Sequence, residues 1–255
     1  MAIYTCLDMI RDCRANAAAG WSYLVRTYLP VTRWLLEHYQ QQRPLETVVQ
    51  QLQDPKLPLW AAPGPATERD FVVQLRLQII PDPNVADNPL DLEILTRAFE
   101  PLTAIERQFV WFDTMAYDTG KTAIVMNVEP NTVEGARQRG DEMLRSNMDN
   151  WSRGLLRKHG WALGHAARGA RTDACLPHLA FLEMIDGRIT WNRKKDIEFH
   201  LMKCWYCVDH FCRIREADYA LHAVSPLGDE EVARFRKLLN LPEERKPLLA
   251  RLFGR

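Results

Sequence analysis

The fold of this chain is decided by residues 119–145, which read TGKTAIVMNVEPNTVEGARQRGDEMLR. Three positions in this stretch match a helix-turn-helix, in which two helices flank a tight turn. Ala123 is small where the second helix must cross the first, and Asn127 tolerates the left-handed backbone conformation that the turn requires. Val133 follows ten residues after Ala123 and would anchor the second helix. The spacing therefore predicts a helix-turn-helix.

The second helix of this motif should begin at Asn131, because Asn131 and Glu134 have the spacing of a capping box. Its polar face carries side chains that can contact DNA. Arginine and glutamine reach base edges in the major groove, and arginine and threonine hold phosphates. Glu134 and Asp141 would repel phosphate, so a solvated helical hairpin without DNA contact stays open. The predicted DNA-binding residues are Thr132, Arg137, Gln138 and Arg145.

Helical periodicity extends over nearly the whole chain. We expect a helix over residues 2–16 with Ile3, Leu7 and Ile10 on one apolar stripe, and we expect Pro30 to end or kink the helix that follows. Residues 187–191 are the only strand candidate, and a weak one. The pattern predicts an all-α fold.

The charges of the chain balance overall but not locally. Its 255 residues carry 33 Lys and Arg against 33 Asp and Glu, and 47% are hydrophobic, which excludes a polycation or a disordered acidic chain. Residues 1–100 hold 9 basic and 12 acidic side chains, whereas residues 151–171 hold 5 basic and none acidic. Any DNA contact should therefore be local, around residues 132–171.

The N-terminus and the cysteines predict a cytoplasmic protein. No apolar run approaches the ~20 residues of a membrane helix, so we expect no membrane partner. Asp8 and Arg11 interrupt the stretch where a signal peptide would be apolar. Cys6 and Cys13 lie seven residues apart on a helical pattern and are expected in the core. Four further cysteines fall within 38 residues, a density that favours metal binding or redox chemistry in a reducing compartment.

The strongest chemical signal is the sequence His200-Leu-Met-Lys-Cys204-Trp-Tyr-Cys207. On a helix these three side chains would face one side, and zinc binds such mixed nitrogen and sulfur ligands tetrahedrally. We expect Cys175 as the fourth ligand, ahead of the other candidates His178, Cys212 and His210.

Three other interpretations of this motif stay open: an iron–sulfur cluster, a metal-free thiol cluster, and a redox pair of Cys204 and Cys207. A hydrolytic zinc site would need an open coordination position and a nearby general base. Glu198 is close in sequence, but no His-x-Glu or His-Glu-x-x-His spacing occurs. We therefore predict that the protein is not an enzyme.

Two segments resemble extracytoplasmic-function sigma factors. Residues 101–107, Pro-Leu-Thr-Ala-Ile-Glu-Arg, with Phe109-Val110 and Thr132-Val133, resemble the promoter-recognition region of that family. Residues 14–40 are similar to the opening of its N-terminal domain, which binds the polymerase clamp. The resemblance implies two helical domains, with RNA polymerase core and promoter DNA as partners.

The metal motif resembles the zinc-binding anti-sigma domain. That family has His-x-x-x-Cys-x-x-Cys preceded by an upstream Cys or His, and residues 180–189 look like its Leu-Asp-Gly turn. The resemblance covers residues 172–215 and implies a small helical zinc domain, with a sigma or anti-sigma protein as a further candidate partner.

Together these features predict a transcription regulator of sigma-factor type, whose zinc domain inhibits or senses in cis. The alternative is an interaction scaffold or anti-sigma-like regulator that has lost DNA binding. The expected parts are a sigma N-terminal-like domain (1–89), a helix-turn-helix domain (90–150), a basic linker (151–171), a zinc domain (172–222) and a helical tail (223–255) that covers a groove or binds a partner.

Overall fold

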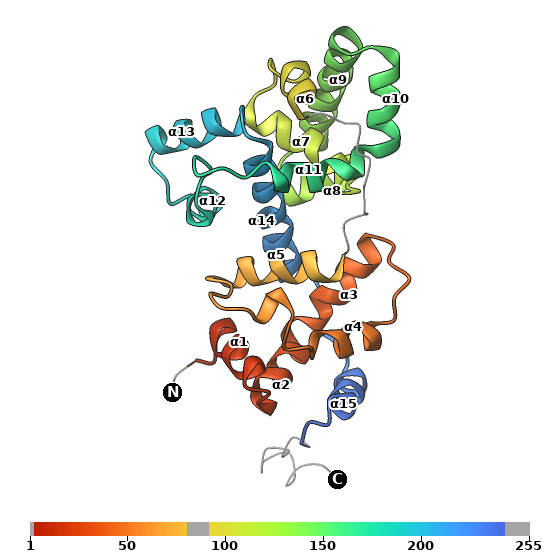
Figure 1. Ribbon diagram of the computed structural model, residues 1–255, viewed down its shortest axis with the longest axis vertical. Coiled ribbons are helices and arrows are strands. Elements are labelled where there is room, and N and C mark those ends of the chain that lie inside the picture. Colours follow the sequence, from red (N-terminus) through yellow and green to blue (C-terminus); the bar gives the residue numbers. More distant parts are fainter. Residues whose placement is uncertain (1–2, 81–91, 243–255) are drawn as a thin grey trace. The chain divides into compact units, whose positions relative to one another are not determined.

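The computed structural model describes residues 3–80 and 92–242, apart from the side chains of residues 157–159 and 161 (Figure 1). These described residues form helices and no strand, which confirms the all-α prediction. The described residues divide into two compact units: residues 3–80 with 223–242, and residues 92–222. The finer five-part division stays a prediction.

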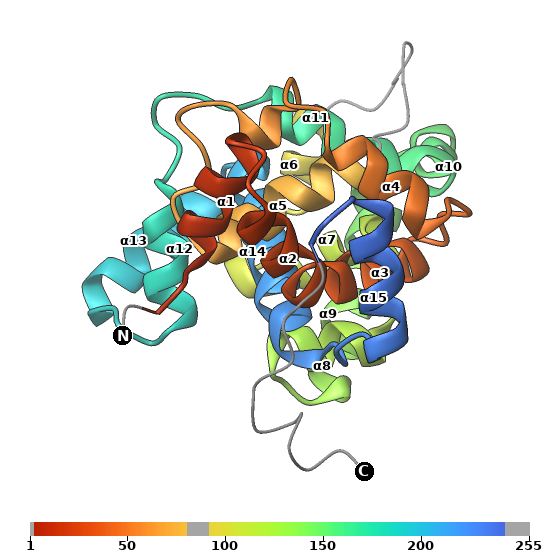
Figure 2. The same ribbon diagram turned by 90° about the horizontal axis from the view of Figure 1, so that it is seen from below.

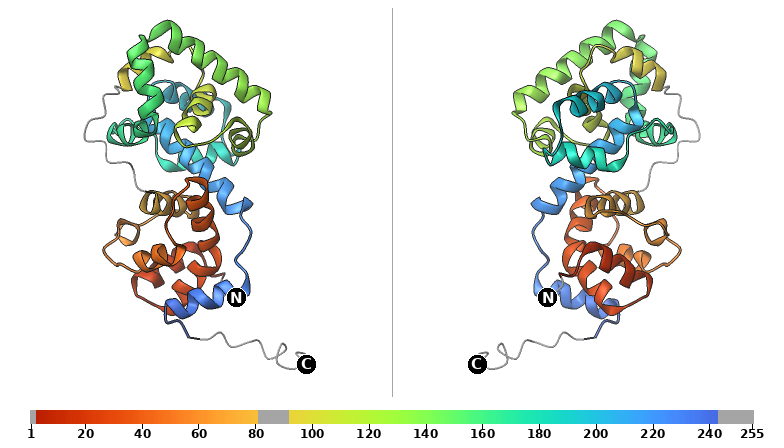
Figure 3. Two further views of the ribbon diagram at one scale, coloured as in Figure 1. Left: turned by 90° about the vertical axis from the view of Figure 1, so that its right-hand side faces the viewer. Right: turned by 90° about the vertical axis from the view of Figure 1, so that its left-hand side faces the viewer.

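The first unit combines the two ends of the chain. Figures 2 and 3 show the blue helix α15 among the red and orange helices. Its Arg33 and Glu231 pair at 3.1 Å, and Arg236 donates to Ser22 at 2.9 Å. The described part of the expected helical tail therefore covers a face of this unit, whereas the tail beyond residue 242 lies outside the described residues. The unit contains α1 (Cys6–Arg14), α2 (Ala18–Thr27), α3 (Leu29–His38), α4 (Leu45–Leu52), the 3-10 turn η1 (Pro58–Trp60), α5 (Glu68–Ile79) and α15 (Asp229–Leu238).

The second unit holds both the helix-turn-helix and the cysteine cluster. Residues 151–171, expected as a linker, are mostly helical. None of the helices in either described part combines the length and apolar content that crossing a bilayer requires. The elements of the unit are α6 (Leu92–Ala98), α7 (Ala104–Thr114), α8 (Thr119–Met126), α9 (Pro130–Asn147), α10 (Asn150–His159), the 3-10 turn η2 (Gly160–Ala162), α11 (Leu163–Gly169), α12 (His178–Ile185), α13 (Trp191–Leu201) and α14 (Trp205–Ala223).

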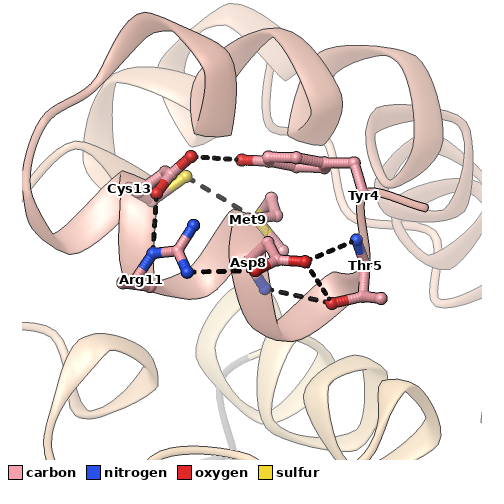
Figure 4. A network of polar contacts seen from close by, with 7 residues as sticks. Tyr4, Thr5, Asp8, Met9, Arg11 and Cys13 are labelled. Carbon is pink, nitrogen blue, oxygen red and sulfur yellow. Dashed lines mark hydrogen bonds and ion pairs between the residues drawn. The ribbon is translucent and has the colours of Figure 1, made fainter. Parts of the chain in front are cut away.

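The first helix begins later than expected, and this changes which residues are buried. Thr5 caps α1 and exchanges hydrogen bonds with Asp8 (Figure 4). Ile3 precedes the helix and is 87% exposed, and Leu7 is 51% exposed, so of the expected stripe of Ile3, Leu7 and Ile10 only Ile10 is buried. The side chains of α1 that pack into the core lie at the helical spacing i, i+3, i+4 and i+7. They are Cys6, Met9, Ile10 and Cys13, which confirms the two expected core thiols.

Pro30 breaks the second helical pattern as predicted. Tyr28 ends α2, and Pro30 lies in the first turn of α3, where its missing N–H costs no helical hydrogen bond. The Tyr28 ring is fully buried against Phe71 of α5, with ring centroids 4.7 Å apart, and its hydroxyl donates to Glu68 at 2.7 Å. The break therefore positions an aromatic side chain at the centre of the first unit.

The helix-turn-helix is confirmed in its geometry. Ala123 and Val133 are buried between α8 and α9, and Asn127 ends α8 in the left-handed region with φ 52°. The expected helix start was wrong, because α9 begins at Pro130 with no side-chain cap. A proline at the first position is already set at the helical φ angle, so the Asn131 capping box is not needed.

Two glycines give a matched test of the packing between α1 and α2. A Cβ at Gly20 would lie 2.6 Å from the Cys13 nitrogen, whereas a Cβ at Gly154 in α10 has no neighbour within 4 Å. We expect Gly20→Ala to lower the free energy of unfolding by about 1–3 kcal/mol, because the two backbones must separate. Gly154→Ala should raise it by about 0.5–1 kcal/mol. Urea titrations of the two variants check this, and equal midpoints would contradict it.

Candidate metal centre

The cysteine cluster is assembled at the ends of three helices. Figure 1 shows α12 and α13 beside the start of α14. Cys175 lies just before α12, His200 is in the last turn of α13, and Cys207 is in the first turn of α14. Cys204 occupies the break between α13 and α14, so the single continuous helix considered for this motif does not form. The turn at 202–204 nevertheless keeps the three motif side chains on one side.

The turn between α12 and α13 depends on a glycine. Gly187 has φ 67°, a conformation that side chains with a Cβ rarely adopt. The N–H of Arg188 donates to the Glu183 carbonyl at 2.9 Å and closes the end of α12. This reversal returns the chain into α13, which carries His200.

Four side chains converge on one point. The ligand atoms of Cys175, His200, Cys204 and Cys207 all lie within 4.8 Å of one another. The sulfurs of Cys175 and Cys204 are 3.7 Å apart, and His200 Nε2 is 3.1 Å from Cys207 Sγ. In a tetrahedral shell with metal–sulfur bonds of about 2.3 Å, neighbouring sulfurs lie about 3.8 Å apart. The cluster can therefore hold a tetrahedral metal ion with little movement.

The surroundings of the cluster favour the thiolate of Cys204, whereas the hydrogen bond with Cys204 and burial raise the pKa of Cys207. Cys207 is fully buried, and the other three side chains are half-buried. The thiol of Cys207 holds the pKa of Cys204 well below its ordinary value by hydrogen bonding to it. The N–H of Thr172 donates to Cys175 Sγ at 3.2 Å. Such hydrogen bonds orient metal-binding thiolates.

The structure separates the predicted fourth ligand from its competitors. Among the described residues, only Cys175 joins the three motif residues in one cluster. Cys212 is buried next to the Gln108 carbonyl, with its sulfur 3.9 Å from that oxygen. His178 and His210 contact each other, with ring nitrogens 3.2 Å apart. The predicted ligand set is therefore the one that the fold brings together.

The helix that leaves the cluster carries two buried acidic residues that the sequence analysis missed. Asp209 accepts a hydrogen bond from Trp111 Nε1 at 3.0 Å, and Glu216 accepts one from the Tyr117 hydroxyl at 2.9 Å. Both acids are 1% exposed. Their seven-residue spacing places them on one face of α14, a signal that was present in the sequence. They connect the metal cluster to α7 and to the loop before the helix-turn-helix.

The four predicted DNA-binding residues differ in their surroundings. Thr132, Gln138 and Arg145 are exposed on α9. Arg137 has only 16% of its side chain exposed and pairs with Asp113. It also donates to the hydroxyls of Thr119 and Thr122 and to the Tyr117 carbonyl, at 2.7, 3.1 and 2.9 Å. Arg137 thus joins α7, α8 and α9, and DNA contact stays a prediction for all four.

Compared with known proteins, the chain matches no family model, no curated protein and no solved structure.

The cluster predicts a ligand-specific loss of metal. We expect Cys175→Ala to weaken Zn²⁺ binding by more than about 100-fold, since even residues outside the ligand shell contribute 10–100-fold. Isothermal titration of the metal-stripped, reduced full chain with Zn²⁺ measures this affinity.

Cys212→Ala is the matched control, because it removes a nearby buried thiol that does not belong to the cluster. Its Zn²⁺ affinity should stay at the wild-type value. The ligand assignment would be wrong if both variants bound Zn²⁺ like the wild type, or if Cys212→Ala lost binding instead.

Proposed function

We propose that this protein is a transcription regulator of sigma-factor type, in which a structural zinc site holds an anti-sigma-like module against the helix-turn-helix of the same chain. The observation that carries the proposal is α14. This helix begins at the Cys3His cluster and continues into buried contacts with Trp111 and Tyr117, which flank the start of the helix-turn-helix.

Zinc fits the ligand set better than other metals do. Three thiolates and one imidazole are a donor set typical of Zn²⁺. Four protein ligands also complete a tetrahedral shell, as in structural sites, whereas catalytic sites keep a position for water. The proposal therefore assigns the zinc to stability and regulation, not to catalysis. All six cysteines are free, which agrees with the reducing, cytoplasmic setting that we propose.

The docking of α14 is polar and buried. Trp205, between two of the ligands, donates to Thr96 of α6 at 2.9 Å and stacks on Trp111 with ring centroids 5.1 Å apart. Arg215 donates to Gln108 of α7 at 3.1 Å. A buried hydrogen bond left without its partner costs about 1–3 kcal/mol, so such contacts fix one arrangement of the two modules. This arrangement is what inhibition in cis requires.

Promoter DNA and RNA polymerase core are the proposed partners. Thr132, Gln138 and Arg145 are exposed along α9 and can reach a groove or its phosphates. The zinc module would set how readily α9 engages DNA. A separate sigma or anti-sigma protein is a further candidate partner, which would compete for the α7 surface that α14 covers.

A second function is favoured by the charge of α9. Its exposed acids Glu134, Asp141 and Glu142 outnumber the exposed arginines Arg139 and Arg145. Arg139 pairs with Glu106, and Arg145 lies 3.7 Å from Asp141. A face with little free positive charge attracts phosphate weakly. An interaction scaffold that has kept the helix-turn-helix but lost DNA binding accounts for this pattern.

A DNA selection experiment separates the two functions. The zinc-loaded full chain, alone and with RNA polymerase core, is incubated with a random DNA pool at low salt. The sigma-type proposal predicts an enriched sequence. Gln138→Ala should weaken binding to that sequence roughly tenfold, because one good base contact is worth about 1–3 kcal/mol.

Arg97→Ala provides the control, since Arg97 is exposed on α6 and pairs with Glu93 of the same helix. It should bind like the wild type. Polymerase binding with no enriched DNA sequence would favour the scaffold. If the chain binds no polymerase and enriches no DNA sequence, both proposed functions are contradicted.

A further inference from the structure

The second unit contains a cavity that the proposed function does not use. Its volume is about 520 Å³, within the range of roughly 300–1,000 Å³ that is usual for small-molecule sites. Most of the walls come from α6, α7, α9 and α10, and the rest from Phe99, from the first residues of η2 and α11, and from the first residue of α14. One wall is therefore the second helix of the helix-turn-helix, and another is adjacent to the metal ligands.

Aromatic side chains form part of the cavity wall. Trp111 and Trp205 are stacked on each other, with ring centroids 5.1 Å apart and planes 24° apart, and only 2% and 5% of their surfaces are exposed. Both indole N–H groups already donate, to Asp209 and Thr96, so what the rings present to a ligand is apolar. Phe99, Leu144 and Leu156 extend this apolar lining. Such a lining suits an aromatic ring that packs edge-on.

The rim of the cavity is positive. Three arginines line it, Arg137, Arg145 and Arg153, against two aspartates, Asp113 and Asp141. Each aspartate pairs with one arginine, Asp113 with Arg137 and Asp141 with Arg145. The third arginine, Arg153, donates to the neutral side chain of Asn150. This contact leaves the positive charge of Arg153 uncompensated. One excess positive charge therefore selects a ligand with a single negative group.

From this geometry we propose that the cavity binds a small planar aromatic molecule that carries one negative charge, such as an aromatic carboxylate or sulfonate. The rings pack against the apolar wall beside Trp111 and Trp205, and the anionic group lies against Arg153. A bound molecule would contact α9 directly. The site requires only the folded second unit, so it does not depend on DNA binding.

Two probes with the same ring skeleton test the site in the zinc-loaded full chain. 1-Anilinonaphthalene-8-sulfonate carries one negative charge, and N-phenyl-1-naphthylamine carries none. Fluorescence titration should show the sulfonate binding once per chain and more tightly than the neutral amine. In Arg153→Gln the sulfonate should bind about three- to tenfold more weakly, with the amine unchanged.

Leu144→Trp tests the location of the site, because the larger ring fills the cavity. Both probes should lose binding in this variant while the circular dichroism spectrum keeps its helical form. Trp191→Ala is the control for adhesion to exposed aromatic surface, since Trp191 is 66% exposed on α13 and does not line the cavity. It should leave both affinities unchanged.

The proposal is overturned if Arg153→Gln leaves the preference for the sulfonate intact, or if Trp191→Ala abolishes binding. Because Arg153 lies at the rim, its variant gives a result even if Leu144→Trp does not fold. The DNA selection described above uses no ligand, so its failure and the failure of this site are separate outcomes.

Discussion

The second unit depends on the hydrogen bonds and ion pairs made by the buried carboxylate of Asp209. This carboxylate accepts hydrogen bonds from Trp111 at 3.0 Å and from Arg213 at 2.7 and 2.9 Å, and Arg168 lies 3.8 Å away. Burial alone would raise the pKa of Asp209, but the Arg213 guanidinium offsets this and holds it below its ordinary value. A buried charge is tolerated only when it is paired, so α7, α11 and α14 must meet at this point. Cys207 precedes Asp209 by two residues, so one ligand of the metal cluster and this anchor lie in the first turns of one helix.

Local signals made part of the structure predictable. The spacing of Ala123, Asn127 and Val133 predicted the helix-turn-helix, because tight turns and helix crossings are decided within a few residues. The metal motif was equally local, and its side chains converge although the helix breaks at Cys204. The errors were local as well. Several candidate caps and apolar stripes compete at a helix start, and the stripe expected through Ile3 and Leu7 followed from a start that was too early.

Long-range polar contacts were not predictable in the same way. Trp111 and Asp209 are 98 residues apart, and no periodic pattern links them. Arg137 is a second example, because its sequence position on the polar face of α9 suggested DNA, while its contacts are with α7, α8 and the loop between them. Arginine serves both purposes, since its planar fork matches phosphates, carboxylates and carbonyls alike. Only the three-dimensional arrangement separates the two roles.

The central claim is that the metal cluster and the helix-turn-helix are parts of one folded unit joined by α14. Amide hydrogen exchange of the full chain, with Zn²⁺ bound and after its removal by a chelator under reducing conditions, tests this most directly. Structural zinc contributes its binding energy to folding. The account predicts that zinc removal speeds exchange in α8 and α9 as well as in residues 175–207. A change confined to residues 175–207, with α8 and α9 as protected as before, would contradict it.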